Sequence, residues 1–381
     1  MRFRFFEPDD DRETARLLEI EHGARSLWAD IASSPPGPES LLRQRRLLAA
    51  IEPGLAMEFD PQQGYILRPF EESSLRALAD WLVQRAPPSV TAGSARRPTD
   101  LVQALGAVER DHGFDLRDAR ARVEFTRGHL FEVVVRARGL GSPLDDKRLD
   151  AANQLVAMLL GDDLVDHWIG AVEVAPALPA NPLKLLQPER GGEGTWLPLA
   201  ELERALRGAL ETVDTNLSAL PCHRYCERAD WSLLELSPRA DTAVPAPDDC
   251  LVATTMLPEM FKCFLECNHF SSRRFSRNDE TFVCIKYRTH GSLEENYAPR
   301  VELEEALNRA LVPAEVGCVV ANGLGVRHAY IALALAELEA GLEIARRTLR
   351  RVHAPRPAWI LFCDEIWQRE WLPVWEGQSA P

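Results

Sequence analysis

Two stretches of the chain, 89–175 and 251–321, carry the same order of predicted elements: strand, helix, strand, strand, helix, strand. In each stretch, two short segments of alternating apolar and polar residues flank a turn, which is the pattern of a β-hairpin. This order of elements is that of the ferredoxin-like fold. We therefore predict an α+β protein with two tandem ferredoxin-like (βαββαβ) units, whose mixed or antiparallel sheets are covered by helices.

The first predicted unit spans residues 53–178. Apolar residues recur at helical spacing over Thr99–His112 and Asp145–Leu160, which predicts two helices. A strand at Gly64–Arg68 and a helix at Glu71–Arg85 are expected to extend its sheet. The four strands of the repeated order are predicted at Ser89–Ser94, Ala121–Phe125, Leu130–Arg138 and Ala171–Ala175.

The second predicted unit spans residues 229–381. Its helices are expected over Leu257–Cys267 and Val301–Leu311, and the Asn322-Gly323 pair predicts a tight turn into an added strand, helix and strand. An aromatic C-terminal tail follows. The predicted strands are Leu251–Thr255, Arg273–Ser276, Thr281–Arg288, Val316–Ala321, Ala329–Leu335 and Ala358–Cys363, and the added helix is Ala336–His353.

Two further segments complete the expected organisation. Residues 1–52 form a predicted N-terminal helical extension of two helices, because prolines within Ser33–Pro38 interrupt the apolar pattern. Residues 179–228 combine a proline- and glycine-rich stretch with a predicted helix over Leu199–Leu220. We interpret this last segment as a connector between the two units.

Composition limits the partners of the chain. Its 381 residues include 58 acidic and 44 basic ones, a formal net charge of -14, so the average surface repels nucleic acid and anionic lipid. The first residues do not resemble a signal peptide, and no apolar run approaches the roughly 18 residues that cross a bilayer. We therefore expect a cytoplasmic protein with reduced cysteines and no nucleic-acid or membrane partner.

Cysteine and histidine gather at two places in the second half of the chain. A Cys-x3-Cys pair with a nearby histidine occurs at each place, and zinc prefers tetrahedral sets of thiolate and imidazole ligands. The competing interpretation is that these thiols are small core residues, as we also expect for Cys284, Cys318 and Cys363. Zinc is the one cofactor that the sequence suggests. Its candidate ligands are Cys222, His223, Cys226, Cys263, Cys267 and His269.

Acidic residues offer further candidates. Asp162, Asp163 and Asp166 cluster after a predicted helix without the ligand pattern of a calcium loop, which favours a solvated loop. Asp364 and Glu365 are adjacent at the end of a predicted strand, so their side chains are expected on opposite faces of the sheet. The sequence signatures of serine hydrolases, phosphate-binding loops, zinc proteases and kinases are absent.

These observations favour a non-catalytic interaction or regulatory protein that binds another protein through sheet or tail surfaces. The candidate tail contacts are Trp367, Trp371 and Trp375. The alternative is a metal- or thiol-dependent enzyme that uses the cluster Cys222, Cys226, Cys263 and Cys267. A third hypothesis, RNA binding through Arg273–Arg277, predicts an affinity that falls steeply with salt.

Overall fold

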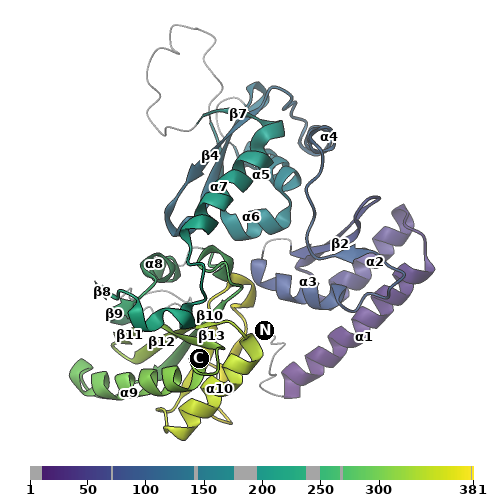
Figure 1. Cartoon of the computed structure of the whole chain (residues 1–381). Helices are drawn as coiled ribbons and strands as arrows, with labels where there is room; N and C mark the ends of the chain where they lie inside the picture. Colours follow the sequence, from purple (N-terminus) through teal and green to yellow (C-terminus); the bar gives the residue numbers. More distant parts are fainter. Residues whose placement is uncertain are drawn as a thin grey trace. The chain divides into compact units, whose positions relative to one another are not determined.

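A computed structural model of the chain describes residues 11–69, 72–140, 145–175, 195–236, 249–266, 269–378 and 380–381 (Figure 1). Within these ranges the protein is a mixed α+β structure with open sheets and no closed barrel, which confirms the predicted class. Contacts divide the chain into two units, and the predicted four-part division stays a prediction. Unit 1 comprises Met1–Glu58, Arg68–Val90 and Leu217–Pro381, and unit 2 comprises Phe59–Leu67 and Thr91–Asn216.

The first part of unit 1 is helical, as predicted. Its elements are α1 (Asp11–Ser33), α2 (Pro38–Ile51), a 3-10 turn η1 (Ser73–Leu75) and α3 (Arg76–Val83). The hydroxyl of Ser40 accepts the backbone N–H of Gly37 at the start of α2 (2.9 Å). The indole N–H of Trp28 donates to the carbonyl of Leu82 (3.0 Å), which joins α1 to the end of α3.

A small sheet has the strand order β1-β2-β3. Its strands are β1 (Leu55–Asp60), β2 (Gly64–Pro69) and β3 (Ala92–Gly93). β1 was not predicted from the sequence, although Leu55 and Met57 alternate with their neighbours in burial. The strand predicted at Ser89–Ser94 reduces to β3, which pairs in parallel with β2.

Unit 2 contains a second sheet with the order β6-β5-β4-β7. Its strands are β4 (Arg120–Phe125), β5 (Phe131–Arg136), β6 (Ile169–Val174) and β7 (Leu197–Pro198), and its helices are α4 (Leu101–His112), α5 (Asp146–Leu160), α6 (Asp162–Trp168) and α7 (Leu202–Asn216). The predicted hairpin is confirmed, with Phe125 opposite Phe131 in an antiparallel pair. Val133 and Val135 pack into a core with Leu155, because alternate strand residues share one face.

A ferredoxin-like arrangement is not confirmed in unit 2. In that fold the first strand lies between the third and fourth strands of the repeat. Here β6 lies directly beside β5 and parallel to it, and β3, the remnant of the predicted first strand, belongs to the small sheet. The order of elements along the sequence and the hairpin of β4 and β5 were therefore predicted correctly, but the positions of β3 and β6 differ from the ferredoxin-like order.

The largest sheet lies in unit 1 and has seven antiparallel strands in the order β14-β13-β10-β12-β11-β9-β8. The strands are β8 (Ser232–Glu235), β9 (Cys250–Thr255), β10 (Thr281–Arg288), β11 (Gly317–Gly325), β12 (His328–Leu335), β13 (Ala358–Phe362) and β14 (Trp371–Pro373). Because β12 lies between β10 and β11, this half is not ferredoxin-like either, and the expected duplication is not confirmed.

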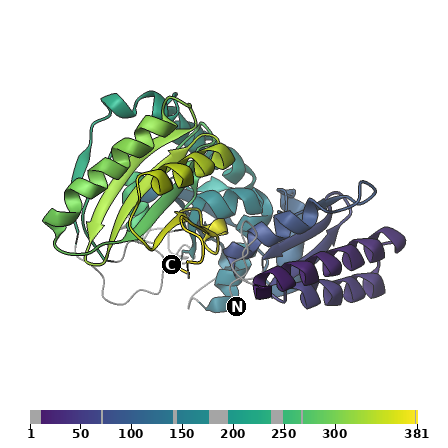
Figure 2. The same ribbon diagram turned by 90° about the horizontal axis from the view of Figure 1, so that it is seen from below.

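Two helices, α9 (Leu293–Leu311) and α10 (Leu338–Arg351), lie side by side on one face of this sheet (Figure 2). Val283 and Ile285 of β10 point toward them and share a core with Leu307 and Leu349. All four side chains are fully buried. A capping box at Ser292 and Glu295 sets the start of α9, well before the predicted start at Val301.

The opposite face of the large sheet is covered by irregular segments and one short helix. Phe282, Cys284 and Val320 point to this side and share a second core with Phe261 of the helix. The covering elements are α8 (Pro258–Glu266) and the 3-10 turns η6 (Cys222–Arg224), η7 (Cys226–Arg228) and η8 (Ser272–Arg274). Both faces of the sheet are thereby buried, which explains why its central strands are almost wholly apolar.

Two local predictions in this half are wrong. The strand expected at Arg273–Ser276 is instead the turn η8, because Asp364 accepts both the backbone N–H and the hydroxyl of Ser272 and curls the chain there. The turn expected at Asn322-Gly323 lies within β11. A Cβ atom on Gly323 would come within 2.7 Å of the Cys250 sulfur, so glycine permits β9 to approach. The strand that follows, β12, nevertheless pairs with β11, as the turn signal predicted.

Asp249 fixes the true turn between β11 and β12. Its carboxylate accepts the backbone N–H groups of Arg327 (2.6 Å) and His328 (3.0 Å) and the hydroxyl of Tyr330. Burial by itself raises the pKa of this carboxyl, but the contacts with His328, Tyr330 and the backbone N–H of Arg327 outweigh it and lower the pKa to about 2.

Replacement of Asp249 by asparagine is expected to reduce the free energy of unfolding by about 1–3 kcal/mol at pH 7, because one carbonyl oxygen replaces two carboxylate oxygens at these donors. A carboxylate with a lowered pKa stabilises the folded state above its unfolded value of 3.8, and this contribution is lost as pH falls toward about 2. Urea unfolding from about pH 7 to about pH 3 measures the difference in free energy of unfolding between the unsubstituted chain and this variant. We expect that difference to narrow below about pH 4. The exposed Asp230→Asn variant is the control, and a pH-independent difference would contradict the assignment.

Candidate functional site

The predicted zinc ligands lie at two places on the face of the large sheet that α8 and the turns cover. Cys222 and His223 are on η6, Cys226 begins η7, Cys263 is on α8, His269 follows α8, and Cys267 lies outside the described residues. Of the seven described cysteines, all but Cys226 are buried in one core cluster, so the core interpretation accounts for most of these thiols. The buried ones are Cys222, Cys250, Cys263, Cys284, Cys318 and Cys363.

A buried carboxylate anchors the first turn. The backbone N–H of Cys222 donates to Oε1 of Glu280 (2.8 Å), and the hydroxyl of Ser276 donates to Oε2 of the same residue (2.7 Å). Only 3% of Glu280 is exposed. Since both carboxylate oxygens are occupied, Glu280 fixes the start of η6 against the segment that enters β10.

Three cysteines pack in the core beneath η6 and η7. Cys222 and Cys318, the second residue of β11, belong to one buried cluster, and Cys226 packs against it with its sulfur 3.7 Å from the carbonyl oxygen of His223. The Cys222 sulfur is 3.5 Å from the hydroxyl of Tyr225. Sequence reasoning assigned Cys318 to the core, but its place beneath η6 and η7 depends on residues about a hundred positions away in the chain and carries no local signal.

The pKa values of these thiols diverge. The hydrogen bond from Cys318 lowers the pKa of Cys226 to about 7, although partial burial opposes the shift. Burial, together with the charge of Glu280, raises the pKa of Cys222 well above the usual range for a thiol. Donation to Cys226 and burial likewise raise the pKa of Cys318. At neutral pH, Cys226 is therefore the thiol of this group with a substantial thiolate fraction.

The second place is organised by a buried arginine. The guanidinium of Arg274 is fully buried, and its Nη2 donates to the Cys263 sulfur (3.6 Å) and to the backbone carbonyl of His269. Burial lowers the pKa of Arg274, opposed by the neighbouring Cys263. The RNA-binding hypothesis requires the arginines of Arg273–Arg277 at the surface. Arg274 is buried and does not meet this requirement.

Beside this arginine, the exposed side chain of His269 lies within ion-pair distance of Glu365. Nδ1 of His269 lies 2.6 Å from Oε2 of Glu365, and the hydroxyl of Ser73 donates to Oε1 of the same carboxylate. Arg369 and Glu72 form a further ion pair nearby. These contacts connect η1 with η9 (Glu365–Trp367). The polar side chains here therefore have a structural role inside unit 1.

Among the described residues, no three histidine, cysteine, aspartate or glutamate side chains are arranged to hold a metal ion. The Cys222 sulfur contacts the hydroxyl of Tyr225, and the Cys226 sulfur contacts the carbonyl oxygen of His223. The Cys263 sulfur accepts from Arg274, a cation that opposes metal binding at the same atom. The zinc hypothesis, which also includes Cys267, stays a prediction of the sequence.

Elemental analysis tests that hypothesis. We expect protein purified without a metal-affinity tag to hold zinc and iron far below one atom per chain, because the thiols have other partners. A variant with Cys263→Ser and Cys267→Ser is the control. A near-stoichiometric metal content that disappears in this variant would contradict the expectation and establish the cluster as a metal centre.

The aromatic tail packs on unit 1 itself. Trp371 is buried in β14 beside Leu361 of β13, and Trp367 lies 6.4 Å from Phe362 between ring centroids. The guanidinium of Arg356 lies 4.0 Å above the ring of Trp375. These contacts fit the capping of the sheet edge, and a role of the tail in partner binding stays a prediction.

The acidic candidates have structural partners as well. Asp162 is buried at the start of α6, where it accepts the backbone N–H of Arg96 (2.8 Å). Asp364 points into the core toward Ser272, whereas Glu365 points toward His269, so adjacent carboxylates diverge as expected. Burial raises the pKa of Asp364, although the bonds from Ser272 oppose the shift.

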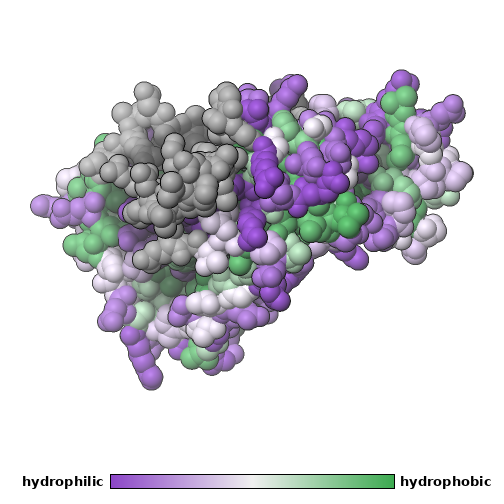
Figure 3. All heavy atoms as spheres, turned by 90° about the horizontal axis from the view of Figure 1, so that it is seen from above, coloured by the Kyte–Doolittle hydropathy of each residue, from purple (hydrophilic) through white to green (hydrophobic). Residues whose placement is uncertain are grey.

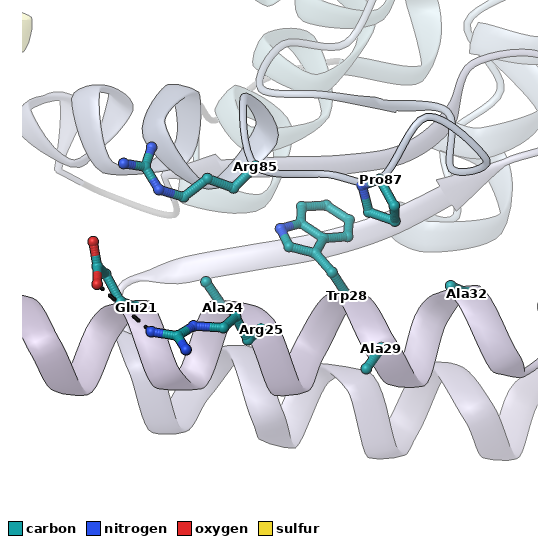
Figure 4. Close-up of a pocket in the computed structure, with 8 residues that line it drawn as sticks. All are labelled: Glu21, Ala24, Arg25, Trp28, Ala29, Ala32, Arg85 and Pro87. Atoms are coloured by element: carbon teal, nitrogen blue, oxygen red, sulfur yellow. Dashed lines mark ion pairs between the residues drawn. The ribbon is translucent and has the colours of Figure 1, made fainter.

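A groove of about 610 Å³ lies between α1 and the chain that leaves α3 (Figure 4). Trp28 points into it from α1, facing Pro87, and Ala24 and Ala32 line the same helix. The rim carries Arg25, Arg85 and Glu21. This mixture of charges does not define one class of ligand.

The edge of the large sheet at β8 is open among the described residues. β8 pairs with β9 on one side, and the described chain contains no strand on its other side. The side chains of Trp231 and Leu233 are 41% and 64% exposed. This strand was not predicted from the sequence, although apolar residues are frequent over Trp231–Leu236.

The face of the molecule that Figure 3 shows is mixed in polarity. On the face in Figure 3, polar and charged side chains alternate with small apolar groups among the residues drawn in colour. Within the described ranges, none of the helices is long and apolar enough to cross a membrane. Comparison of the chain with protein-family models, with curated proteins and with solved structures gives no match.

Proposed function

We propose that this chain is a non-catalytic protein that binds another protein, and that it does so by accepting a strand of its partner at β8. The observation that carries the proposal is the edge of the seven-stranded sheet at β8, beside which the described part of the chain places no further strand. An unpaired edge presents a row of backbone donors and acceptors, and an added strand satisfies them without any particular sequence.

The ladder between β8 and β9 identifies which groups are available. The backbone N–H of Leu236 donates to the carbonyl of Leu251 (2.9 Å). Hydrogen-bonded pairs alternate along an antiparallel ladder, so Leu234 and Ser232 also bond inward. The backbone groups of Leu233 and Glu235 therefore point away from β9, toward the position of an added strand.

The side chains beside these groups favour a protein partner. Exposed Leu233 and Trp231 offer apolar contact area, and indole rings are enriched at protein interfaces. Glu235 next to them adds a negative charge that nucleic acid and anionic membranes would repel. For the same reason we include no nucleic-acid or membrane partner in the proposal. We also propose a cytoplasmic location, because the free thiols stay reduced there.

The enzyme alternative has less support. An active site built on Cys222, Cys226, Cys263 and Cys267 requires those thiols to converge with a base on one pocket. Contacts of the Cys263 sulfur with Arg274 and of the Cys222 sulfur with Tyr225 favour separate structural roles.

Proline at position 233 tests strand addition. The backbone N–H of Leu233 points away from β9, and proline has no N–H. Leu233→Pro therefore removes an outward donor and leaves the hydrogen bonds between β8 and β9 intact. A photo-crosslinking amino acid at Glu235, in cells that naturally produce the chain, is expected to trap one discrete protein. Leu233→Pro should reduce this adduct by about tenfold or more, whereas Leu233→Thr, which keeps the N–H, should largely retain it.

The same crosslinker at Val352, which is 38% exposed at the end of α10, is the matched control. Equal adducts at the two positions would contradict strand addition at β8, and so would an adduct at 235 that Leu233→Pro leaves unchanged. The melting temperatures of the variants exclude unfolding as the cause of a lost adduct.

A further inference from the structure

We propose that the strand accepted by β8 is a short segment of the partner protein with a basic residue at each end and apolar residues between them. This inference rests on the proposed strand addition at β8 and adds the chemistry of the partner segment. It is drawn from the charges and the exposed side chains of residues 230–236, which include the edge strand and the two residues before it.

Two carboxylates lie near the two ends of this edge. Asp230 is two residues before β8, and Glu235 is the last residue of the strand. Both residues are exposed, and neither has an ion-pair partner within the part of the chain that the structure describes. The sequence between them contains no basic residue. A strand that lies alongside β8 therefore meets a negative charge near each of its ends.

The middle of the edge is apolar. Trp231 and Leu233 are both exposed. Glu235 lies opposite Val252, which packs on the core beneath α9 and α10, so Glu235 and Leu233 point to the face that carries these helices. Leu234 points to the other face and packs on the core that contains the buried cysteines. An added strand therefore has apolar neighbours on both faces.

An antiparallel orientation sets the register of the partner's charges. Neighbouring strands of this sheet pair antiparallel throughout its described length, and we infer the same for the added strand. Partner residues opposite Leu233 and Glu235 then exchange backbone hydrogen bonds with them. The basic residues are the one opposite Glu235 and the one five positions later, beside Asp230. Opposite charges directly across two strands stabilise their pairing.

The same charges disfavour a second copy of the chain as the occupant. If two β8 strands pair around Glu235, its carboxylates face each other, and like charges directly opposite destabilise a strand pair. A pairing centred on Leu234 sets each Glu235 opposite a leucine and supplies no cation. Charged residues on edge strands commonly prevent such self-association. Glu235 thus acts against the copy and in favour of a basic segment.

Charge supplies the selectivity of this contact, whereas backbone hydrogen bonds and apolar area supply most of its affinity. Each exposed ion pair changes the affinity by a small factor, and salt screens it. The pair at Glu235 is therefore not essential for binding, and a crosslinker that replaces this residue still traps the partner.

Three synthetic peptides with acetylated and amidated ends test the inference on the full isotope-labelled chain. The first, Lys-Val-Val-Thr-Val-Lys, carries its lysines five positions apart. The second, Lys-Lys-Val-Val-Thr-Val, has the same composition with its charges together, and the third, Glu-Val-Val-Thr-Val-Glu, has the opposite charges. Amide chemical shifts of Leu233 and Glu235 during titration at low ionic strength report both affinity and place of binding. We expect the first peptide to bind about fivefold more tightly than either of the others.

A variant with Asp230→Asn and Glu235→Gln is the matched control, because it removes both charges and keeps the strand. The preference for the first peptide over the second should disappear in this variant. In a second variant, with Asp230→Lys and Glu235→Lys, the third peptide should bind most tightly. Melting temperatures show whether each variant is folded.

Equal binding of the first two peptides at the β8 amides, or a preference that survives in the control variant, would overturn this inference and leave strand addition itself supported. Failure of all three peptides to shift these amides at millimolar concentration would also overturn it, and crosslinking of the natural partner then decides the proposed function separately. Dimerisation of the chain that shifts the same amides without peptide would assign the edge to a second copy instead.

Discussion

Burial of both faces of the seven-stranded antiparallel sheet is the condition on which the rest of unit 1 depends. α9 and α10 cover one face, where the side chains of Val283 and Ile285 pack into an aliphatic core. The other face is covered mainly by turns, which cannot satisfy their own backbone groups as a helix does. Small thiols and phenyl rings fill that core, and buried polar side chains must supply the missing hydrogen bonds.

Two buried carboxylates supply them. Glu280 accepts the N–H of Cys222 at η6, and Asp364 accepts the N–H of Ser272 at η8 (2.7 Å). The hydroxyl of Ser272 in turn accepts the N–H of Phe282 (3.0 Å), so the turn is joined to β10. These contacts also explain where the cysteines lie: because Glu280 holds the start of η6, Cys222 and Cys226 pack on the core cluster that contains Cys318.

The sequence predicted what depends on local patterns. Helices α1, α2, α5 and α10 follow from apolar spacing, proline and capping residues, and the hairpin of β4 and β5 follows from alternation around a turn. Strand order was not predictable, because the position of β12 between β10 and β11 depends on contacts between distant segments. Two ferredoxin-like units were inferred from element order alone, and element order leaves the pairing open.

In the candidate sites, too, local spacing was predictable and contacts between distant segments were not. Spacing identified Cys222 and Cys226 as a pair, but their packing against the core that contains Cys318 arises only when η6 and η7 lie on β11. Spacing likewise placed Cys263 in a metal cluster, whereas the partner of its sulfur is Arg274, a residue expected in a strand. The edge strand β8 was missed because its alternation is too short to stand out from a loop.

The central functional claim is that β8 leaves its outer side open in the free chain. Residue-resolved amide hydrogen exchange tests it most directly, because inward and outward amides alternate along one short strand. We predict slow exchange at Leu234 and Leu236, whose N–H groups bond to β9, and fast exchange at Leu233 and Glu235. Equally slow exchange at all four amides in the isolated chain would show that the edge is already covered and would contradict the account.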